Sequence, residues 1–157
     1  MTENSNAIHR IKMGFVNALL YGRPGHWLLI DAGTRITMPL FFSQLEALGC
    51  EPAHIALLVV THVHYDHVGG IGRLRKQAPV PVAVHAAEAD ILQTAQFVIS
   101  DGLNLVACVQ AFAARHPLNK AFVAFDPVGL DVVVESEMRL DHYGFGAPTV
   151  LHPGIPH

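Results

Sequence analysis

The chain has 157 residues with a formal net charge of −3, and 51% of its residues are hydrophobic while 15% are charged. This length and hydrophobic content favour a single packed domain, residues 1–157, over a disordered chain. The slightly acidic balance offers no basic surface for nucleic acid, and no apolar run approaches the roughly 20 residues that span a membrane. We therefore expect a cytoplasmic protein that binds neither nucleic acid nor a membrane.

The first part of the chain alternates apolar segments with turn residues. Residues Phe15 to Tyr21 and Trp27 to Ile30 are predicted strands, and the turn residues Gly22 to Gly25 between them indicate a hairpin. Apolar residues then recur at helical spacing from Met38 to Leu48, and Gly49 stands where a helix would end. A hairpin followed by a helix is expected.

Further strands and helices follow in alternation. The apolar run Ile55 to Val60 predicts a buried strand, Ile71 to Lys76 a helix, and Pro79 to Val84 a short strand in which the first proline is tolerated only at the start or edge. This alternation predicts an α/β fold, in which ligands usually bind at the C-terminal ends of the strands.

The remaining elements are also predicted from apolar spacing. Ala86 to Gln96 and Leu103 to Arg115 are predicted helices, and the apolar stripe of the second is typical of a core face. The segment Phe122 to Val134 holds two β-prone runs broken by Asp126-Pro127, and a last strand is predicted over Thr149 to Leu151.

Three histidines and an aspartate lie within the seven residues that follow the buried strand. On an extended or loop backbone His62 and His64 project to the same side and can reach one ion, while Asp66 and His67 are near enough to reach a second. These ligands suit zinc, and iron, manganese or cobalt also accept them. One metal lowers the pKa of bound water to about 7, and two metals roughly 3.5–4 Å apart can share a hydroxide. The implied reaction class is hydrolysis.

An alternative interpretation of the cluster is a polar turn whose histidines merely cap the strand. A buried strand that runs into four such side chains makes little physical sense without an ion to neutralise and satisfy them, so the metal site is favoured. Because a catalytic zinc usually has three protein ligands and an open position, four candidates cannot complete two metal spheres. More ligands must come from elsewhere in the chain.

The segment His62-Val63-His64-Tyr65-Asp66-His67 resembles the HxHxDH signature of the metallo-β-lactamase superfamily. The segment Leu28 to Gly33 resembles the second-strand motif of that family, and Thr61 and Gly69-Gly70 stand where the family has them. The resemblance implies an αβ/βα sandwich and the hydrolysis of an ester, thioester, lactone or lactam by metal-bound hydroxide.

The resemblance also implies a role for each site residue. His62 and His64 would bind the first metal and Asp66 and His67 the second, with Asp66 as the catalytic residue that orients the nucleophilic water. Asp31 would orient a ligand histidine without binding metal, although a plain turn residue at the end of a strand is the alternative. One or two zinc ions and a small-molecule substrate are therefore expected.

The family carries a third histidine for the first metal, then a bridging aspartate and a final histidine. The segment Leu151 to His157 resembles an interrupted form of the third-histidine segment, in which His152 or His157 is either a substitute ligand or a frayed terminal residue. We therefore expect a sandwich truncated in its second half. The second hypothesis is a truncated or degenerate member that binds metal or a partner without turnover, and an uncovered sheet edge favours a homo-oligomer.

Four other side chains have blander interpretations. Cys50 and Cys108 form no metal-binding spacing and are interpreted as small buried hydrophobic residues. His85 is interpreted as a hydrogen-bonded histidine at a strand end, and Tyr65 either faces the cleft or packs beside the metal loop.

Overall fold

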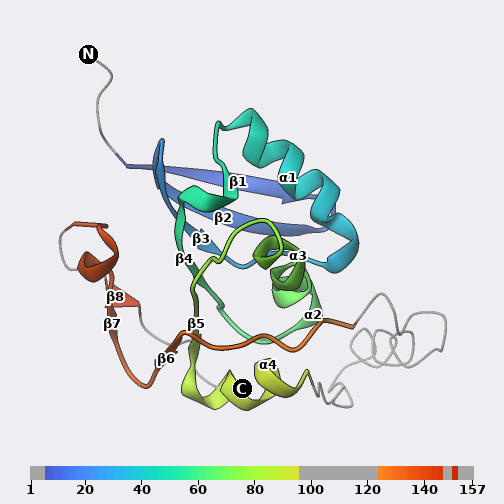
Figure 1. The fold of residues 1–157 in the computed structure, drawn as a ribbon, viewed down its shortest axis with the longest axis vertical. Coiled ribbons are helices and arrows are strands. Elements are labelled where there is room, and N and C mark those ends of the chain that lie inside the picture. The colour runs from blue at the N-terminus through green and yellow to red at the C-terminus, as the bar shows by residue number, and fades with distance from the viewer. Residues whose placement is uncertain (1–5, 96–123, 147–149, 152–157) are drawn as a thin grey trace.

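The structure is a computed structural model that describes residues 6–95, 124–146 and 150–151. Its centre is a six-stranded sheet in the order β1-β2-β3-β4-β5-β6 (Figure 1). The strands are β1 (Ala7–Met13), β2 (Val16–Arg23), β3 (His26–Ile30), β4 (Ile55–Val59), β5 (Val82–His85) and β6 (Val132–Val134). The first three strands are antiparallel neighbours, and β3 to β6 pair in parallel. The α/β class predicted from the sequence is thus confirmed.

In the described ranges four helices accompany this sheet, together with short 3₁₀ turns at Arg35–Thr37, Pro52–His54 and Asp141–Tyr143. The helices are α1 (Met38–Ala47), α2 (Tyr65–Val68), α3 (Ile71–Arg75) and α4 (Ala86–Thr94). None of the helices in the described ranges is both long and apolar enough to cross a membrane. Gly49 ends α1 as predicted, because its positive φ of 64° lets its N–H bond to Glu46 O while Cys50 N–H bonds to Leu45 O.

The larger core lies between the sheet and its helices. It joins inward residues of the strands, such as Trp27 and Leu29, to Phe41 of α1 and Leu92 of α4. A smaller cluster, built around Leu28, Leu57 and Phe145, lies on the opposite face because successive strand residues alternate between faces. The sheet is therefore covered by helices on one side and by residues 138–145 over part of the other.

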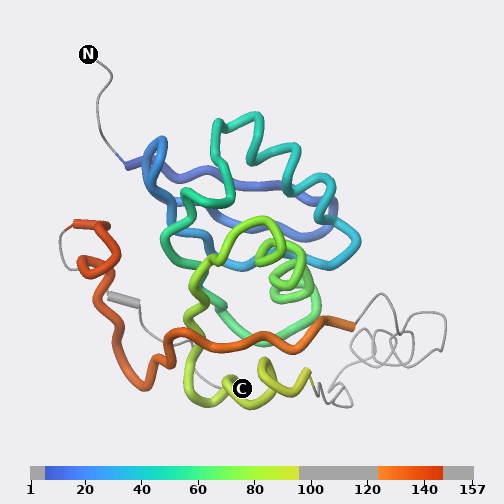
Figure 2. The backbone as a smooth tube through the Cα atoms, viewed as in Figure 1, coloured from blue at the N-terminus to red at the C-terminus, as the bar shows by residue number. Residues whose placement is uncertain are grey.

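Residues 124–131 cross the helix side of the molecule (Figure 2). Val128 N–H bonds to Leu92 O of α4 at 3.1 Å, and Arg75 of α3 donates to Gly129 O at 2.8 Å. Asp131 then accepts the N–H of Val82 at 2.8 Å, which connects the start of β5 to the strand that follows. This segment connects α3, α4 and the sheet.

Several sequence predictions differ from the structure in detail. The strand predicted from Pro79 begins only at Val82, because prolines 79 and 81 have no N–H to donate to the ladder. The described residues of the first β-prone run, Ala124 and Phe125, form no strand, and β1 was not predicted at all.

The last described strands form a second, separate sheet. β7 (Met138–Arg139) pairs antiparallel with β8 (Val150–Leu151), within the segment predicted as a final strand. The predicted helix 103–115, Cys108, His152 and His157 lie outside the described residues. The homo-oligomer stays a prediction.

Candidate metal centre

The cluster lies where two neighbouring parallel strands end. β3 and β4 pair in register up to Ile30 and Val59, and the N–H of Asp31 then bonds to Val59 O at 3.0 Å. Because the carboxyl ends of parallel strands meet at one edge of the sheet, Asp31 and Thr61 come together directly beyond them. The strand pairing thus places a carboxylate from one motif beside the histidines of another.

Asp31 is the most constrained residue of the site. Its side chain accepts the Thr61 N–H at 2.9 Å and the Thr61 hydroxyl at 2.9 and 3.1 Å, and its second oxygen lies 2.7 Å from His67 Nδ1. Only 6% of the residue is exposed, and its φ is 61°, in the left-handed region that non-glycine residues seldom adopt. The hydrogen bond expected from Asp31 to a cluster histidine is present, and it leaves His67 Nε2 available to a metal.

The helix α2 brings the chain back into contact with the segment that follows β3. The N–H groups of His67 and Val68 bond to His64 O, and His67 O accepts the N–H of Ala32 at 2.7 Å. A Cβ on Gly69 or on Gly70 would collide with neighbouring backbone atoms, so the pair permits this close approach. Of the extended or loop backbone predicted for the cluster, the structure has the loop, with bends at Thr61 and His62, and the chain becomes helical at Tyr65.

The four predicted ligands lie together at this turn. The ring centroids of His62 and His67 are 4.0 Å apart, and those of His62 and His64 are 6.1 Å apart. Asp66 hydrogen-bonds to His64 Nδ1, and its second oxygen lies 3.8 Å from His67 Nε2. Asp66 therefore contacts a histidine from each of the two pairs suggested by the sequence.

The surroundings separate the pKa values of these side chains. The Asp31 hydrogen bond raises the pKa of His67 against the effect of burial, whereas burial and the neighbouring His67 lower the pKa of His62. Burial acts to raise the pKa of Asp66, but the His64 hydrogen bond and the charges of His64 and His67 outweigh it, and the net shift is downward. In neutral solution we therefore expect Asp66 to be ionised and His62 to be neutral, the forms that bind metal.

The cluster offers metal-binding atoms without a complete metal-binding geometry in the described residues. Among the described residues no three His, Cys, Asp or Glu side chains converge in an arrangement that would hold one. The donor atoms nevertheless have the right chemistry, because imidazole nitrogen and carboxylate oxygen are zinc ligands. Asp31 also fixes His67 through Nδ1, as a partner of a metal-binding histidine does. The residues therefore fit a zinc ion by the type of their donor atoms and by the hydrogen bond that fixes His67. The described residues alone do not place three donor side chains around one point.

A pocket of about 390 Å³ lies beside the cluster. Asp31, Thr61, Asp66 and His67 line part of it, and residues of the β1–β2 hairpin line the rest. The hairpin contribution was not predicted from the sequence, and it comprises Arg10, Phe15, Val16, Asn17 and Leu19. Residue spacing gives no signal for this contribution, because β1 and β2 bring these residues to the pocket only through strand pairing.

Other side chains near the cluster support its backbone. Glu88 of α4, also missed from the sequence, accepts the N–H of Val63 at 2.6 Å. His85 accepts the N–H of Ala87 at 3.2 Å through Nδ1 and lies 3.2 Å from Glu135 O, which confirms a hydrogen-bonded histidine at a strand end. Tyr65 packs against the larger core with its ring 4.6 Å from that of His64, which favours the packing alternative.

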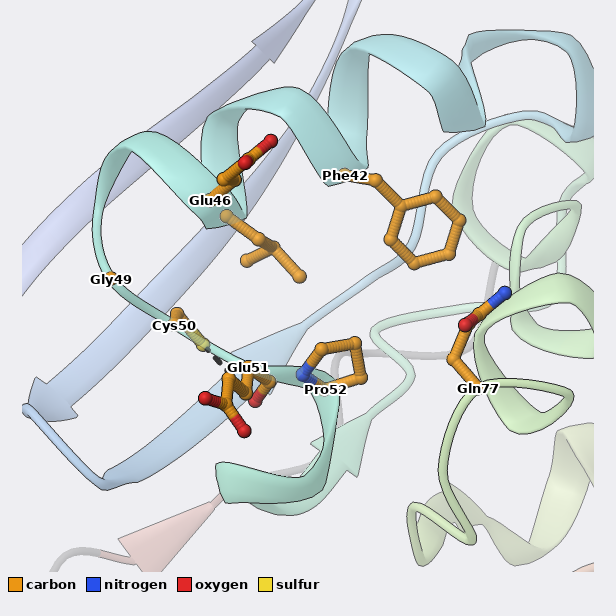
Figure 3. A pocket seen from close by; sticks show the side chains of 8 residues that line it. Phe42, Glu46, Gly49, Cys50, Glu51, Pro52 and Gln77 are labelled. Atoms are coloured by element: carbon orange, nitrogen blue, oxygen red, sulfur yellow. Dashed lines mark hydrogen bonds between the residues drawn. The ribbon is translucent and has the colours of Figure 1, made fainter.

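A second pocket, of about 590 Å³, lies at the opposite end of β4 (Figure 3). Phe42, Leu45, Cys50 and Pro52 are among its lining residues. Cys50 is 3% exposed, and burial together with the charge of Glu51 raises the pKa of its thiol to about 12. The interpretation of Cys50 as a small buried residue is confirmed, and its protonated thiol is a poor nucleophile or metal ligand.

Comparison with known proteins gives a match over most of the chain. A family model described as the metallo-beta-lactamase superfamily matches residues 11–154. Ribonuclease J from Sinorhizobium meliloti is 30% identical over an alignment of 81 residues that covers 46% of this chain and 14% of that protein. The probable metallo-hydrolase YflN from Bacillus subtilis is 26% identical over 89 residues, covering 55% of this chain and 34% of that protein.

Solved structures share the fold. The subclass B3 metallo-beta-lactamase BJP-1 from Bradyrhizobium japonicum superposes with a TM-score of 0.67 at 17% identity, covering 87% of this chain and 46% of that one. A mutant metallo-beta-lactamase from Cronobacter sakazakii gives a TM-score of 0.65 at 24% identity, covering 85% and 47%. The chain thus spans about half the length of these structures, and 34% and 14% of the two curated relatives.

Proposed function

Because the chain belongs to the metallo-beta-lactamase superfamily, which includes metal-dependent hydrolases, we propose that it is a zinc hydrolase of a small-molecule ester, thioester, lactone or lactam. The observation that carries the proposal is the buried Asp31, whose carboxylate fixes both Thr61 and His67 at the strand ends. A backbone held at positive φ around such a contact is typical of functional sites.

The proposed roles follow from the contacts of each side chain. His62, His64, Asp66 and His67 would hold one or two zinc ions, with iron or manganese as alternatives. Bound zinc supplies a Lewis acid that polarises the substrate carbonyl and makes water a nucleophile near neutral pH. Asp66 would orient that water through a carboxylate oxygen, and its lowered pKa favours the ionised form that this role needs. Asp31 holds His67 by Nδ1 and keeps its ring in place.

A second candidate function is metal binding without turnover. It is favoured by one observation, which is that no three donor side chains of the described residues converge on a single point. In that case the cluster binds an ion or a partner and no substrate is hydrolysed. The two candidates differ in turnover, so metal content and hydrolysis must be measured on the same preparation.

The test combines metal analysis with a panel of ester, thioester, lactone and lactam substrates. The hydrolase proposal expects about one equivalent or more of zinc or another transition metal, and turnover that is abolished by chelation and by His64→Ala. The control is His142→Ala, because the His142 side chain is 77% exposed and lies outside the cluster. Bound metal without turnover on any substrate would support the second candidate, and absence of bound metal would overturn the hydrolase proposal.

A further inference from the structure

Arg10 of β1 lines the same pocket as Asp66 and His67. Strand pairing fixes its position, because Arg10 is the register partner of Leu19 in β2 and Leu19 is the partner of Ile30 in β3. These three side chains share one face of the sheet, opposite the buried Ile11. The sheet therefore positions a guanidinium across a short apolar stretch from the cluster.

The guanidinium of Arg10 is uncommitted within the described part of the chain. Three other arginines there are paired with aspartates: Arg35 with Asp126, Arg75 with Asp131, and Arg139 with Asp141. Arg10 forms no ion pair or side-chain hydrogen bond with another described residue, although it lines a pocket that holds two carboxylates. Its hydrogen-bond donors are available to a ligand.

Apolar side chains line the pocket between the cation and the cluster. Phe15 is 65% exposed and Leu19 is 38% exposed, and both line the pocket together with Ile30. Phe15 is held at the hairpin tip because Gly14, with a φ of 77°, makes the two-residue turn between β1 and β2. Exposed apolar side chains of this size gain free energy when a ligand covers them.

We propose that Arg10 binds a carboxylate of the substrate, so that the substrate class is an apolar acyl compound with a free carboxylate distal to the scissile bond. The inference rests on the proposed hydrolase function for the chemistry at the cluster. A guanidinium matches a carboxylate with two parallel hydrogen bonds. A singly charged group is favoured over a phosphate dianion because Arg10 is the one basic Lys or Arg among the lining residues, while Asp31 and Asp66 are acidic.

The test is a binding titration that needs no turnover. The probes are 4-phenylbutyrate and its uncharged amide, added to isotope-labelled protein of measured metal content and followed by amide NMR shifts. We expect Arg10→Gln to weaken binding of 4-phenylbutyrate about three- to tenfold, the range for a charge-assisted contact still open to water. Binding of the amide should be unchanged, and Arg10→Lys should retain most of the affinity.

The matched control is Lys12→Gln, since Lys12 has the same charge in the same strand and does not line the pocket. Thermal melts of each variant show whether it is folded. The proposal is overturned if wild-type protein does not bind 4-phenylbutyrate, if Arg10→Gln weakens both probes equally, or if Lys12→Gln has the same effect as Arg10→Gln. Because the titration is independent of turnover, failure of the hydrolase proposal is seen separately in the metal content and the substrate panel.

Discussion

The two ends of β4 differ in the partners that they provide to buried titratable groups. At its C-terminal end the carboxylate of Asp31 is buried with Thr61 and His67 as partners, and the pKa values of the histidines are shifted in both directions. At its N-terminal end Cys50 is buried among apolar side chains, and the pKa of its thiol rises to about 12. Burial alone makes a group inert, whereas burial beside arranged partners prepares it for chemistry.

The largest contrast between the two ends is expected from glycine substitutions. Gly70→Ala should lower the free energy of unfolding by about 3 kcal/mol or more, because the new Cβ would collide with the backbone of Ala32 and with Met38. Gly49→Ala, at the other end, meets no atom within 4 Å and should lower it by about 1 kcal/mol through its positive φ alone. Urea unfolding measures both, and equal losses would contradict the tight approach at the cluster.

The next contrast concerns the carboxylates. Asp31→Ala should lower the free energy of unfolding by about 2–3 kcal/mol, because Thr61 and His67 lose a buried partner. It should also weaken zinc binding about 10- to 100-fold. Asp126→Ala is the matched control, since its side chain is 46% exposed and its ion pair with Arg35 should contribute 1 kcal/mol or less. A zinc affinity unchanged in Asp31→Ala would remove Asp31 from the site.

A pH effect of definite sign is expected for metal-free protein. Asp31 raises the pKa of His67 in the folded protein. The stabilisation from this pair is therefore complete below the pKa of histidine in the unfolded chain, about 6.5, and is lost as pH rises through the folded pKa. The difference in unfolding free energy between wild type and Asp31→Asn should therefore be larger at pH 5.5 than at pH 8.5. An NMR titration should show the His67 pKa falling in Asp31→Asn. A difference that grows with pH would contradict the pairing.

Asp66 changes the free energy of unfolding with pH in the direction opposite to His67, because its pKa is lowered in the folded protein. Its stabilising effect is present above the unfolded value of 3.8 and is lost as pH falls through the folded pKa.

Zinc binding should also depend on pH, because the metal competes with protons for the imidazoles. The affinity for zinc should therefore weaken as pH falls below about 7. Calorimetric titration with zinc at pH 6 and pH 8 measures this change, and a pH-independent affinity would argue against histidine ligands.

The smallest effect is expected at Cys50. Iodoacetamide should label it slowly in native protein at pH 8 and rapidly after unfolding, because the thiolate is disfavoured and the side chain is 3% exposed. Peptide mass spectrometry distinguishes this label from one on Cys108. Rapid native labelling of Cys50 would show that the pocket in Figure 3 opens readily.

Local patterns predicted much of the secondary structure. Apolar spacing and turn residues that act within a few positions predict the β2–β3 hairpin, α1, β4 and α4. The strand β1 was missed because it has two fully buried apolar residues, Ile11 and Met13, among polar neighbours, and only its pairing with β2 makes it a strand. A segment of this kind depends on its partners.

The cluster shows the same division. Its candidate ligands could be named from the sequence because three histidines and an aspartate within seven positions remain close in any compact turn. The contacts of Glu88 and Arg10 could not be predicted from the sequence. Glu88 bonds to Val63 across 25 residues, and Arg10 comes to the pocket through two strand pairings. Long-range partners are set by topology and register, which residue spacing does not reveal.

The sequence by itself determined which donor atoms the site contains and their order along the chain, because neighbouring residues stay neighbours in every fold. The tertiary structure decided which of these atoms are held, by bringing Asp31 to His67 and Thr61 across 36 and 30 positions. It also decided what faces them, because parallel pairing of β3 with β4 aligns the strand ends and the antiparallel hairpin carries Arg10 to the same pocket. The physical reason is that strand register fixes both the face and the edge at which distant side chains meet.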